Sequence, residues 1–381
     1  MTMTVREAAG SLLAVGLGGE ELTAMERAWL KLVRPAGIIL FRRNIVNAGQ
    51  TRALLAEVRK FCAAHCATFV DVEGGTVNRL RDVLAPIPSV KAVAQAARVS
   101  DRTTLAREHG ELVGRAVKTF GFNSSFAPVL DLGLPESKSV MQTRCAAPDA
   151  GGVVAYAKEF LGGLSAQKVA GCGKHFPGLG GGTLDSHLET PSIQRTWQQL
   201  WEEDLEPYRA LRSQLPMVMI SHAAYPKTKD KKRPASVSNF WINQVLRKRI
   251  GYRGIIVSDD LEMGGVTKFM PIDEAAVATV RVGSDLALIC HHPEPILAVF
   301  EAMISEGERS SEFRKLLLAR ARESERKRAN VFPAKMPPEL SGPQLEALRA
   351  QILAFSETIE KIVPRANGAA PAQPPSLVEM A

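Results

Sequence analysis

Short apolar runs alternate with longer segments of helical periodicity along most of the chain. Eight of these runs are rich in Val, Ile and Leu without clean alternation with polar residues, which is typical of strands buried on both faces. They lie at residues 12–15, 37–41, 68–72, 123–130, 169–175, 217–222, 254–259 and 285–290. Each run is followed by a segment that predicts a helix, at residues 20–32, 48–64, 101–118, 150–167, 197–213, 240–250, 273–281 and 295–305.

Eight strands that each precede a helix predict an α/β fold of the (β/α)8 TIM-barrel type. A doubly wound sheet is the main alternative, because it shows the same alternation of strands and helices. Its phosphate-binding turn should carry three glycines at a fixed spacing after the first strand. The turn at residues 16–21 (GLGGEE) lacks the third glycine, and residues 178–182 (GLGGG) also miss the spacing. We therefore expect no dinucleotide and no other cofactor.

The pattern changes after about residue 306, where we expect a helical extension to follow the barrel. Residues 311–330 predict a charged helix, and Ser341 is a suitable N-cap for a further helix with Pro343 in its first turn. Its apolar positions recur at helical spacing, at Leu345, Leu348, Ile352, Phe355, Ile359 and Ile362. This face should pack on the barrel or on a partner subunit, so a homodimer through this helix is one expected assembly.

These patterns divide the chain into three predicted parts. The catalytic barrel spans residues 1–306, the C-terminal helical extension spans residues 307–363, and an Ala/Pro-rich tail at residues 364–381 is expected to be disordered.

The first residues loosely resemble a signal peptide, because an apolar run follows Arg6. Glu7 precedes that run, however, and no clear cleavage site follows it, so we interpret residues 11–18 as the first strand. The chain has no run of about 18 apolar residues that would predict a transmembrane helix. Its five cysteines are an odd number and widely spaced, which favours a reducing compartment. The expected location is the cytoplasm.

The net charge of 48 − 40 = +8 raises the question of a nucleic-acid or membrane partner. Positive and negative residues are mixed, with basic runs only at residues 227–233 and 314–328. We find no RNA-binding fingerprint and no zinc-finger spacing. We therefore expect neither partner, although nucleic-acid binding stays an alternative that the charge alone supports.

Polar residues gather where the predicted strands end, and in a barrel of this kind that end holds the active site. They are Asp71, Glu73 and Arg79 after the third strand, Asp131 and Arg144 after the fourth, Lys174, His175, Asp185 and His187 at the fifth, His222 at the sixth, Asp259 and Asp260 at the seventh, and His291 and His292 at the eighth. Carboxylates and cations bind sugar hydroxyls well through charge-assisted hydrogen bonds. Glycoside cleavage needs a nucleophile or base and a proton donor on opposite sides of the sugar.

Three questions stay open at the level of residue types. Asp259 and Asp260 are adjacent and so face opposite sides of a strand, and period-two reasoning does not choose between them. Lys174 with His175 could bind a sugar or form a structural ion pair. His291 with His292 could suggest a metal, but no third ligand is spaced to match, so we expect no metal site.

An ordered series of motifs carries a resemblance to a known family. The motifs are GIILFRRNI, DVEGGTVNRL, FAPVLDLG, GKHFPG, LDSH, MISHAAYP, PASVSN and GIIVSDDLEMGG, within residues 10–292. Together they make the chain resemble glycoside hydrolase family 3, in its β-N-acetylglucosaminidase (β-hexosaminidase) branch. One difference is the loop after the GKHFPG motif, which usually reads HGDT in this branch and reads LGGG at residues 179–182 here.

The resemblance implies a role for each matching residue. Asp259 matches the nucleophile that forms a covalent glycosyl-enzyme, and His187, oriented by Asp185, matches the proton donor. The residues that match sugar-binding positions are Asp71, Arg79, Arg144, Lys174 and His175, with Met263 and His222 near the sugar.

The expected activity is that of a retaining exo-β-N-acetylglucosaminidase acting on GlcNAc-containing muropeptides in peptidoglycan recycling. A retaining β-glycosidase with another sugar preference and a catalytically silent sugar-binding barrel are the alternatives.

Overall fold

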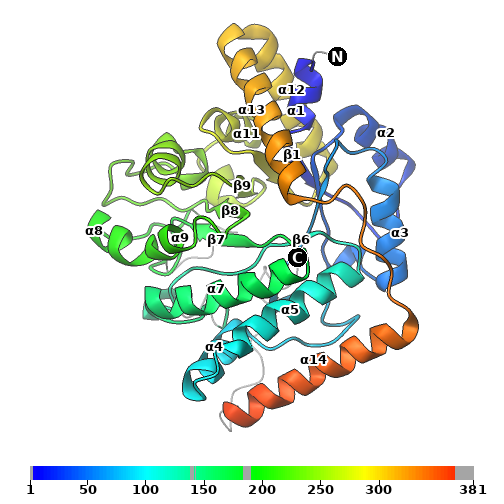
Figure 1. The fold of residues 1–381 in the computed structure, drawn as a ribbon. Helices are drawn as coiled ribbons and strands as arrows, with labels where there is room; N and C mark the ends of the chain where they lie inside the picture. Colours follow the sequence, from blue (N-terminus) through cyan, green and yellow to red (C-terminus); the bar gives the residue numbers. More distant parts are fainter. Residues whose placement is uncertain (1–2, 138–140, 142, 183–189, 365–381) are drawn as a thin grey trace.

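The barrel is formed by eight parallel strands that curve into a nearly closed sheet (Figure 1), in a computed structural model that describes residues 3–137, 141, 143–182 and 190–364. The strand order is β6-β3-β2-β1-β10-β9-β8-β7. The two end strands approach each other through parallel bridges between Ser124 and Ala170 and between Val129 and Lys174. The predicted (β/α)8 architecture is therefore confirmed.

The barrel strands are short and lie within or beside the predicted runs. They are β1 (Leu13–Gly16), β2 (Gly37–Ile39), β3 (Ala67–Val70), β6 (Ser124–Ser125), β7 (Cys172–Phe176), β8 (Met217–Ile220), β9 (Ile255–Asp260) and β10 (Leu286–Ile289). The largest difference is at residues 123–130, where only two residues form regular strand. Pro128 has no backbone N–H to donate, which limits the ladder in this segment.

Helices cover the outside of the barrel. They are α2 (Ala24–Val33), α3 (Ala48–Val58), α4 (Val90–Val99), α5 (Thr104–Thr119), α7 (Ala150–Ala166), α8 (Trp197–Gln199) continued by the π-helical turn η3 (Leu200–Asp204), α9 (Glu206–Ala210), the π-helix η5 (Phe240–Arg249), α10 (Gly264–Thr267), α11 (Ile272–Arg281) and α12 (Pro293–Arg309). Single 3₁₀ turns are η1 (Arg42–Asn44), η2 (Pro135–Ser137) and η4 (Ala235–Val237).

Several elements were not anticipated, and three of them matter for the fold. They are helix α1 (Val5–Gly10), helix α4, and an antiparallel hairpin of β4 (Val72–Gly74) and β5 (Val77–Asn78) that follows β3. Helix α1 begins at Thr4, whose side chain accepts a hydrogen bond from the Glu7 backbone while the Glu7 carboxylate accepts one from Thr4. This capping box starts a helix in the segment that loosely resembles a signal peptide. That segment is an integral part of the fold.

The core has an inner and an outer apolar layer, because successive strand residues point to opposite faces. Alternate residues such as Ile255 and Val257 of β9 fill the barrel interior, and Phe332 completes it from just after helix α13 (Ser311–Val331). The Phe332 ring packs edge-on against Phe69 with centroids 6.2 Å apart. The interior is thus filled by apolar side chains of the described strands and is not an open channel.

The C-terminal helices dock on the barrel, as Figure 1 shows. The predicted charged helix is confirmed as α13, which packs against α1 and α12, and the last predicted helix is confirmed as α14 (Gly342–Ile362). The α14 residues Leu348, Ile352, Phe355 and Ile359 are buried, and α14 packs on α4 and α5. Its apolar face is therefore used within the chain, while a homodimer and the three-part domain division stay predictions. Residues 365–381 lie outside the described part.

No helix among the described residues is long and apolar enough to cross a membrane.

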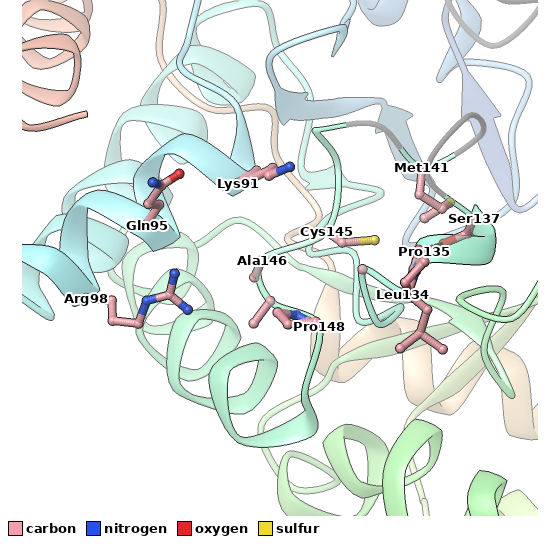
Figure 2. Close-up of a pocket in the computed structure, with 12 residues that line it drawn as sticks. Lys91, Gln95, Arg98, Leu134, Pro135, Ser137, Met141, Cys145, Ala146 and Pro148 are labelled. Carbon is pink, nitrogen blue, oxygen red and sulfur yellow. Dashed lines mark hydrogen bonds between the residues drawn. The ribbon is translucent and has the colours of Figure 1, made fainter. Parts of the chain in front are cut away.

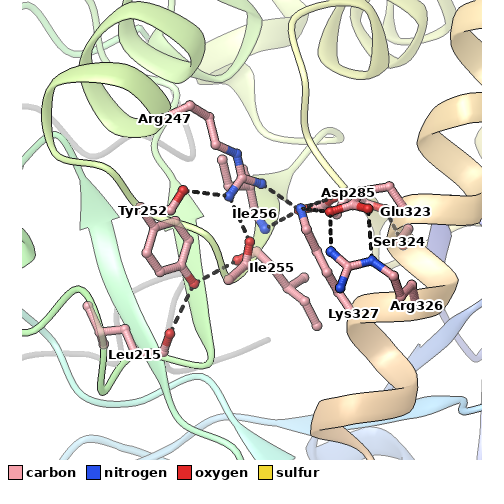
Figure 3. Close-up of polar contacts among 11 residues, drawn as sticks. Leu215, Arg247, Tyr252, Ile255, Ile256, Asp285, Glu323, Ser324, Arg326 and Lys327 are labelled. Atoms are coloured by element: carbon pink, nitrogen blue, oxygen red, sulfur yellow. Dashed lines mark hydrogen bonds and ion pairs between the residues drawn. The ribbon is translucent and has the colours of Figure 1, made fainter.

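Helix α13 is tied to the barrel by a buried ion cluster around Asp285, at the start of β10 (Figure 3). The Asp285 carboxylate accepts hydrogen bonds from the Arg247 guanidinium at 2.8 Å and from Lys327 Nζ at 2.8 and 2.9 Å. It also accepts one from the Ile256 backbone at 2.8 Å. This cluster serves stability, because it lies at the N-terminal end of the strands, away from the end that holds the active site in such barrels.

We expect Asp285→Asn to lower the free energy of unfolding by about 3 kcal/mol, because it leaves two buried cations without their carboxylate. Chemical denaturation would measure this change. The matched control is Arg326→Met on the same helix, since the Arg326 side chain is 65% exposed in its pair with Glu323 and should contribute under about 1 kcal/mol. Equal effects of the two substitutions would contradict the role assigned to the cluster.

Candidate active site

A network of carboxylates and cations covers the ends of β3 and β7. Lys174 Nζ lies 2.8 Å from an Asp71 oxygen and 2.7 Å from a Glu73 oxygen. Arg144 binds Glu73 in a two-pronged pair, with Nε to Oε2 at 2.9 Å and Nη2 to Oε1 at 2.8 Å. Such a bidentate pair fixes the carboxylate plane against the guanidinium plane. Glu73 therefore holds two of the predicted sugar-binding cations, Arg144 and Lys174, in place.

His175 extends this network toward Asp131. Its Nδ1 lies 2.6 Å from Asp131 Oδ2, and its Nε2 lies 3.4 Å from Arg144 Nη2. The other Asp131 oxygen accepts a hydrogen bond from the Leu179 backbone at 2.7 Å. An Nδ1–H that donates to Asp131 leaves Nε2 as the acceptor for Arg144, so Asp131 sets the histidine's orientation and tautomer.

Burial and charge act in opposite directions on these groups. Burial would raise the pKa of Glu73, but Arg144 and Lys174 together lower this pKa to about 2. Burial would likewise lower the pKa of Lys174, but Asp71 and Glu73 raise it above its usual value. For Arg79 burial dominates and lowers the pKa, partly opposed by Asp71. The open question about Lys174 is answered in part, because it forms a buried ion pair at the strand ends.

The strand register places Asp259 on the inner face of the barrel. Ile255 and Val257 point into the interior, so the alternation along β9 carries Asp259 to the same face. Asp259 is partly exposed, and its Oδ1 accepts a hydrogen bond from the Asp260 backbone at 3.0 Å. This is the information that the sequence pattern lacked, and it favours Asp259 over Asp260 as the group that meets a substrate.

Asp260 faces the other way and braces the following turns. Its carboxylate lies 3.3 Å from His291 Nε2 and accepts a hydrogen bond from the Glu262 backbone at 3.1 Å. Glu262 in turn accepts hydrogen bonds from the Cys290 backbone at 2.8 Å and pairs with His292 Nδ1 at 2.6 Å. Within the described ranges, no three His, Cys, Asp or Glu side chains are grouped to hold a metal ion.

His222 lies beneath this strand end and is fully buried. Its Nδ1 lies 2.7 Å from Ser236 Oγ, and its Nε2 lies 2.8 Å from the Asp260 carbonyl oxygen. Burial lowers the pKa of His222. Its Nε2 donates to the carbonyl oxygen, which can only accept, and its Nδ1 forms the second hydrogen bond with the serine hydroxyl. Both ring nitrogens are used by the protein, and the ring supports the backbone that carries Asp259.

The two groups of residues face the same end of the barrel. The buried Cys172 thiol experiences the charges of Lys174, Asp71 and Asp259 together, and burial raises its pKa. Cys290 likewise lies within reach of the charges of Asp259 and Asp71. The inward-facing aspartate therefore shares one polar end with the carboxylate-cation network.

Three further predicted site residues are Met263, Asp185 and His187. Met263 is buried at the start of α10, where its carbonyl accepts a hydrogen bond from Thr267 Oγ1 at 3.1 Å. Asp185 and His187 lie outside the described residues, so their predicted roles stay predictions.

Sequence reasoning did not assign Glu73, Asp131 or Glu262 to the site. The structure gives each of them the task of holding a neighbouring residue. Glu73 and Asp131 stood among the polar residues at strand ends, and that position was the signal that could have found them. Glu262 follows Asp260 by two residues and offered no comparable signal.

This arrangement, a (β/α)8 barrel with charged groups and an inward aspartate at its C-terminal end, defines an enzyme for a polar, hydroxyl-rich substrate. The model of the glycosyl hydrolase family 3 N-terminal domain matches residues 4–317. The chain belongs to this family and is a glycoside hydrolase that acts on O-glycosyl bonds.

Named relatives extend the comparison. The chain is 33% identical over 299 residues to a β-hexosaminidase of Idiomarina loihiensis, covering 78% of this chain and 89% of that protein. Its fold matches a family 3 β-N-acetylglucosaminidase from Paenibacillus with a TM-score of 0.82 and 28% identity, over 93% of this chain and 69% of the other. NagZ from Neisseria gonorrhoeae in complex with N-trifluoroacetyl-D-glucosamine matches with a TM-score of 0.75 and 28% identity, over 93% and 98%.

Proposed function

We propose that the protein is a retaining exo-β-N-acetylglucosaminidase that removes terminal β-linked GlcNAc. The single observation that carries this proposal is the inward position of Asp259 at the same end of the barrel as the network around Glu73. The activity named for the relatives from Idiomarina and Paenibacillus supports the choice of sugar.

In the proposed first step, an Asp259 oxygen attacks the anomeric carbon as the glycosidic C–O bond breaks. His187, oriented by Asp185, gives its proton to the departing oxygen, and a covalent glycosyl-aspartate forms. In the second step His187 takes a proton from water, which attacks the same carbon and releases Asp259. Two displacements on one carbon retain the β configuration.

The network residues would hold the sugar during both steps. Lys174, Arg144 and Arg79 supply hydrogen-bond donors for hydroxyl oxygens, while Asp71 supplies an acceptor for hydroxyl protons. Because Glu73 fixes Lys174 and Arg144, and Asp131 fixes His175, before substrate arrives, little ordering is needed on binding.

We further propose that the natural substrates are muropeptides and that the enzyme works in the cytoplasm. The five free, buried cysteines support a reducing compartment.

The test of the sugar preference is hydrolysis of aryl β-GlcNAc beside aryl β-glucoside. We expect kcat/KM to be at least about 100-fold higher for the GlcNAc substrate. A site that forms hydrogen bonds with the N-acetyl group discriminates against a sugar that lacks this group. Equal or higher activity on the glucoside would indicate a β-glycosidase of different preference. Hydrolysis of neither substrate would indicate a sugar-binding barrel without catalysis.

A further inference from the structure

Two cysteines lie close together in the loop that joins α3 to β3. Cys66 directly precedes β3, so the loop is at the N-terminal end of the strands, opposite the candidate active site. The Cys62 and Cys66 side chains are hydrogen-bonded to each other. Their sulfurs also lie 3.4 Å from backbone carbonyl oxygens, those of Val58 and Ala67 respectively. The two free thiols are therefore held in contact.

Two guanidinium groups lie against this loop from different helices. Arg328 of α13 donates from Nη1 to the carbonyl oxygens of Ala64 at 2.6 Å and His65 at 3.3 Å. Arg59, just after the end of α3, donates from Nη1 to the Cys66 carbonyl oxygen at 3.3 Å. Two positive charges therefore lie beside the loop that carries the cysteines.

The charge of Arg328 has no carboxylate partner among the described residues. The side chain is fully buried, and its Nε and Nη2 atoms have no hydrogen-bond partner in the described part of the chain. Burial lowers the pKa of Arg328, and Cys66 opposes this most strongly, ahead of Glu325. A buried cation without a counter-charge is costly. A negatively charged sulfur at Cys66 would supply that counter-charge.

Their surroundings make the two thiols unequal. The hydrogen bond with Cys62 lowers the pKa of the Cys66 thiol, and the charges of Arg59 and Arg328 lower it further, against the effect of burial. The same hydrogen bond raises the pKa of Cys62, and burial raises it further. Oxidants react with the thiolate form, and a neighbouring thiol can convert the product to a disulfide. This arrangement favours Cys66 as the reactive thiol.

The other three cysteines have different surroundings. Cys145 lines a pocket of about 380 Å³, in which Figure 2 shows its sulfur. It is 5% exposed, compared with 7% for Cys62 and 3% for Cys66. Burial raises the pKa of the Cys145 thiol, and it does the same for Cys172 and Cys290. Local charge, rather than exposure, should therefore distinguish Cys66 from Cys145.

We propose that Cys62 and Cys66 form a dithiol site that hydrogen peroxide oxidises to a disulfide, independently of the proposed function. The Cys66 thiolate attacks one peroxide oxygen and the O–O bond breaks. Cys66 becomes a sulfenic acid, and the released hydroxide takes up a proton to form water. The Cys62 sulfur then attacks the Cys66 sulfur and displaces its hydroxyl group, which leaves with the Cys62 proton as a second water. The two thiols are oxidised by two electrons, and the peroxide is reduced to two waters.

Mass spectrometry tests this site directly. Both cysteines lie in one tryptic fragment, residues 61–79, which contains none of the other three. The folded protein is treated with hydrogen peroxide, and the remaining thiols are then alkylated under denaturing conditions. We expect fragment 61–79 to lose two hydrogens and take up no alkyl group, reversibly on reduction, while the other three cysteines are alkylated. Absence of this disulfide, or earlier oxidation of the other cysteines, would overturn the proposal. The result does not depend on hydrolysis of any glycoside.

Single cysteine variants separate the two steps. Cys62→Ser should stop the reaction at the sulfenic acid of Cys66, which dimedone would trap as a stable adduct. Cys66→Ser should give no such adduct, because the thiol that remains has the raised pKa. A dimedone adduct on Cys62 in the second variant, and none on Cys66 in the first, would reverse the assigned roles.

An arginine variant tests the part played by charge. Arg59→Met should slow formation of the disulfide about tenfold, because it removes one of the two charges beside the thiolate. The matched control is Arg52→Met on the same helix, whose hydrogen bonds go to the carbonyl oxygens of Lys118, Thr119 and Pro337 instead. This control should oxidise at the wild-type rate. Equal rates in the two variants would contradict activation of Cys66 by its arginine neighbours.

Discussion

Replacing Asp259 with alanine is expected to lower kcat/KM on aryl β-GlcNAc by on the order of 10³-fold or more. Removal of a covalent nucleophile prevents the glycosyl-enzyme bond of the first step from forming. The interior position of Asp259 is the reason to expect this, because Ile255 and Val257 of the same strand face fill the barrel. The measurement is steady-state kinetics with equal unfolding temperatures as the folding check.

The adjacent carboxylate supplies the control. Asp260→Asn keeps the shape of a group that pairs with His291 and caps the Glu262 turn, so it should cost about tenfold or less. A larger loss for Asp260→Asn than for Asp259→Ala would reverse the assignment of the two aspartates.

Replacing Glu73 with glutamine is expected to lower the free energy of unfolding by about 3–5 kcal/mol, because Lys174 and Arg144 would then share buried surroundings without this carboxylate. The matched control is Glu57→Gln. In its ion pair with Arg27, the Glu57 side chain is 34% exposed and the Arg27 side chain 42% exposed. Loss of this pair should therefore lower the free energy of unfolding by under about 1 kcal/mol. Denaturant unfolding of both variants measures the difference, and equal small effects would contradict a structural role for Glu73.

Comparison of Glu73→Gln with the wild type also gives a pH dependence of stability with a defined sign. The folded-state pKa of Glu73, about 2, is below its ordinary value of 4.5, so folding favours the ionised form. Its stabilisation is therefore complete above about pH 4.5 and is lost as the pH falls toward 2. The stability gap between wild type and Glu73→Gln should narrow over that range, and a gap that widens on acidification would contradict the ion-pair network.

Much of the barrel could be predicted because buried parallel strands leave an apolar signature that does not depend on long-range contacts. Helix α4 was not predicted, although its sequence carries the signals of a helix: Ser89 caps it, and Val90, Val93 and Ala96 form its buried stripe. The helix predicted at residues 240–250 is present as η5, but its π-helical form was not predicted, because this hydrogen-bond spacing leaves no distinct pattern of residue types.

The site was predictable only in part. Strand ends identified which polar residues would gather, but the pairing of Arg144 with Glu73 joins residues 71 positions apart. Whether Asp259 points into the barrel likewise depends on which face of β9 lines the interior, and that is set by how the whole sheet closes.

The most direct test of the central claim is the configuration of the first product, followed by proton NMR before the free sugar equilibrates. A glycosyl-aspartate formed on Asp259 requires two displacements, so the β-anomer of GlcNAc should appear first and the α-anomer only later. First appearance of the α-anomer would mean a single displacement by water and would contradict a covalent role for Asp259.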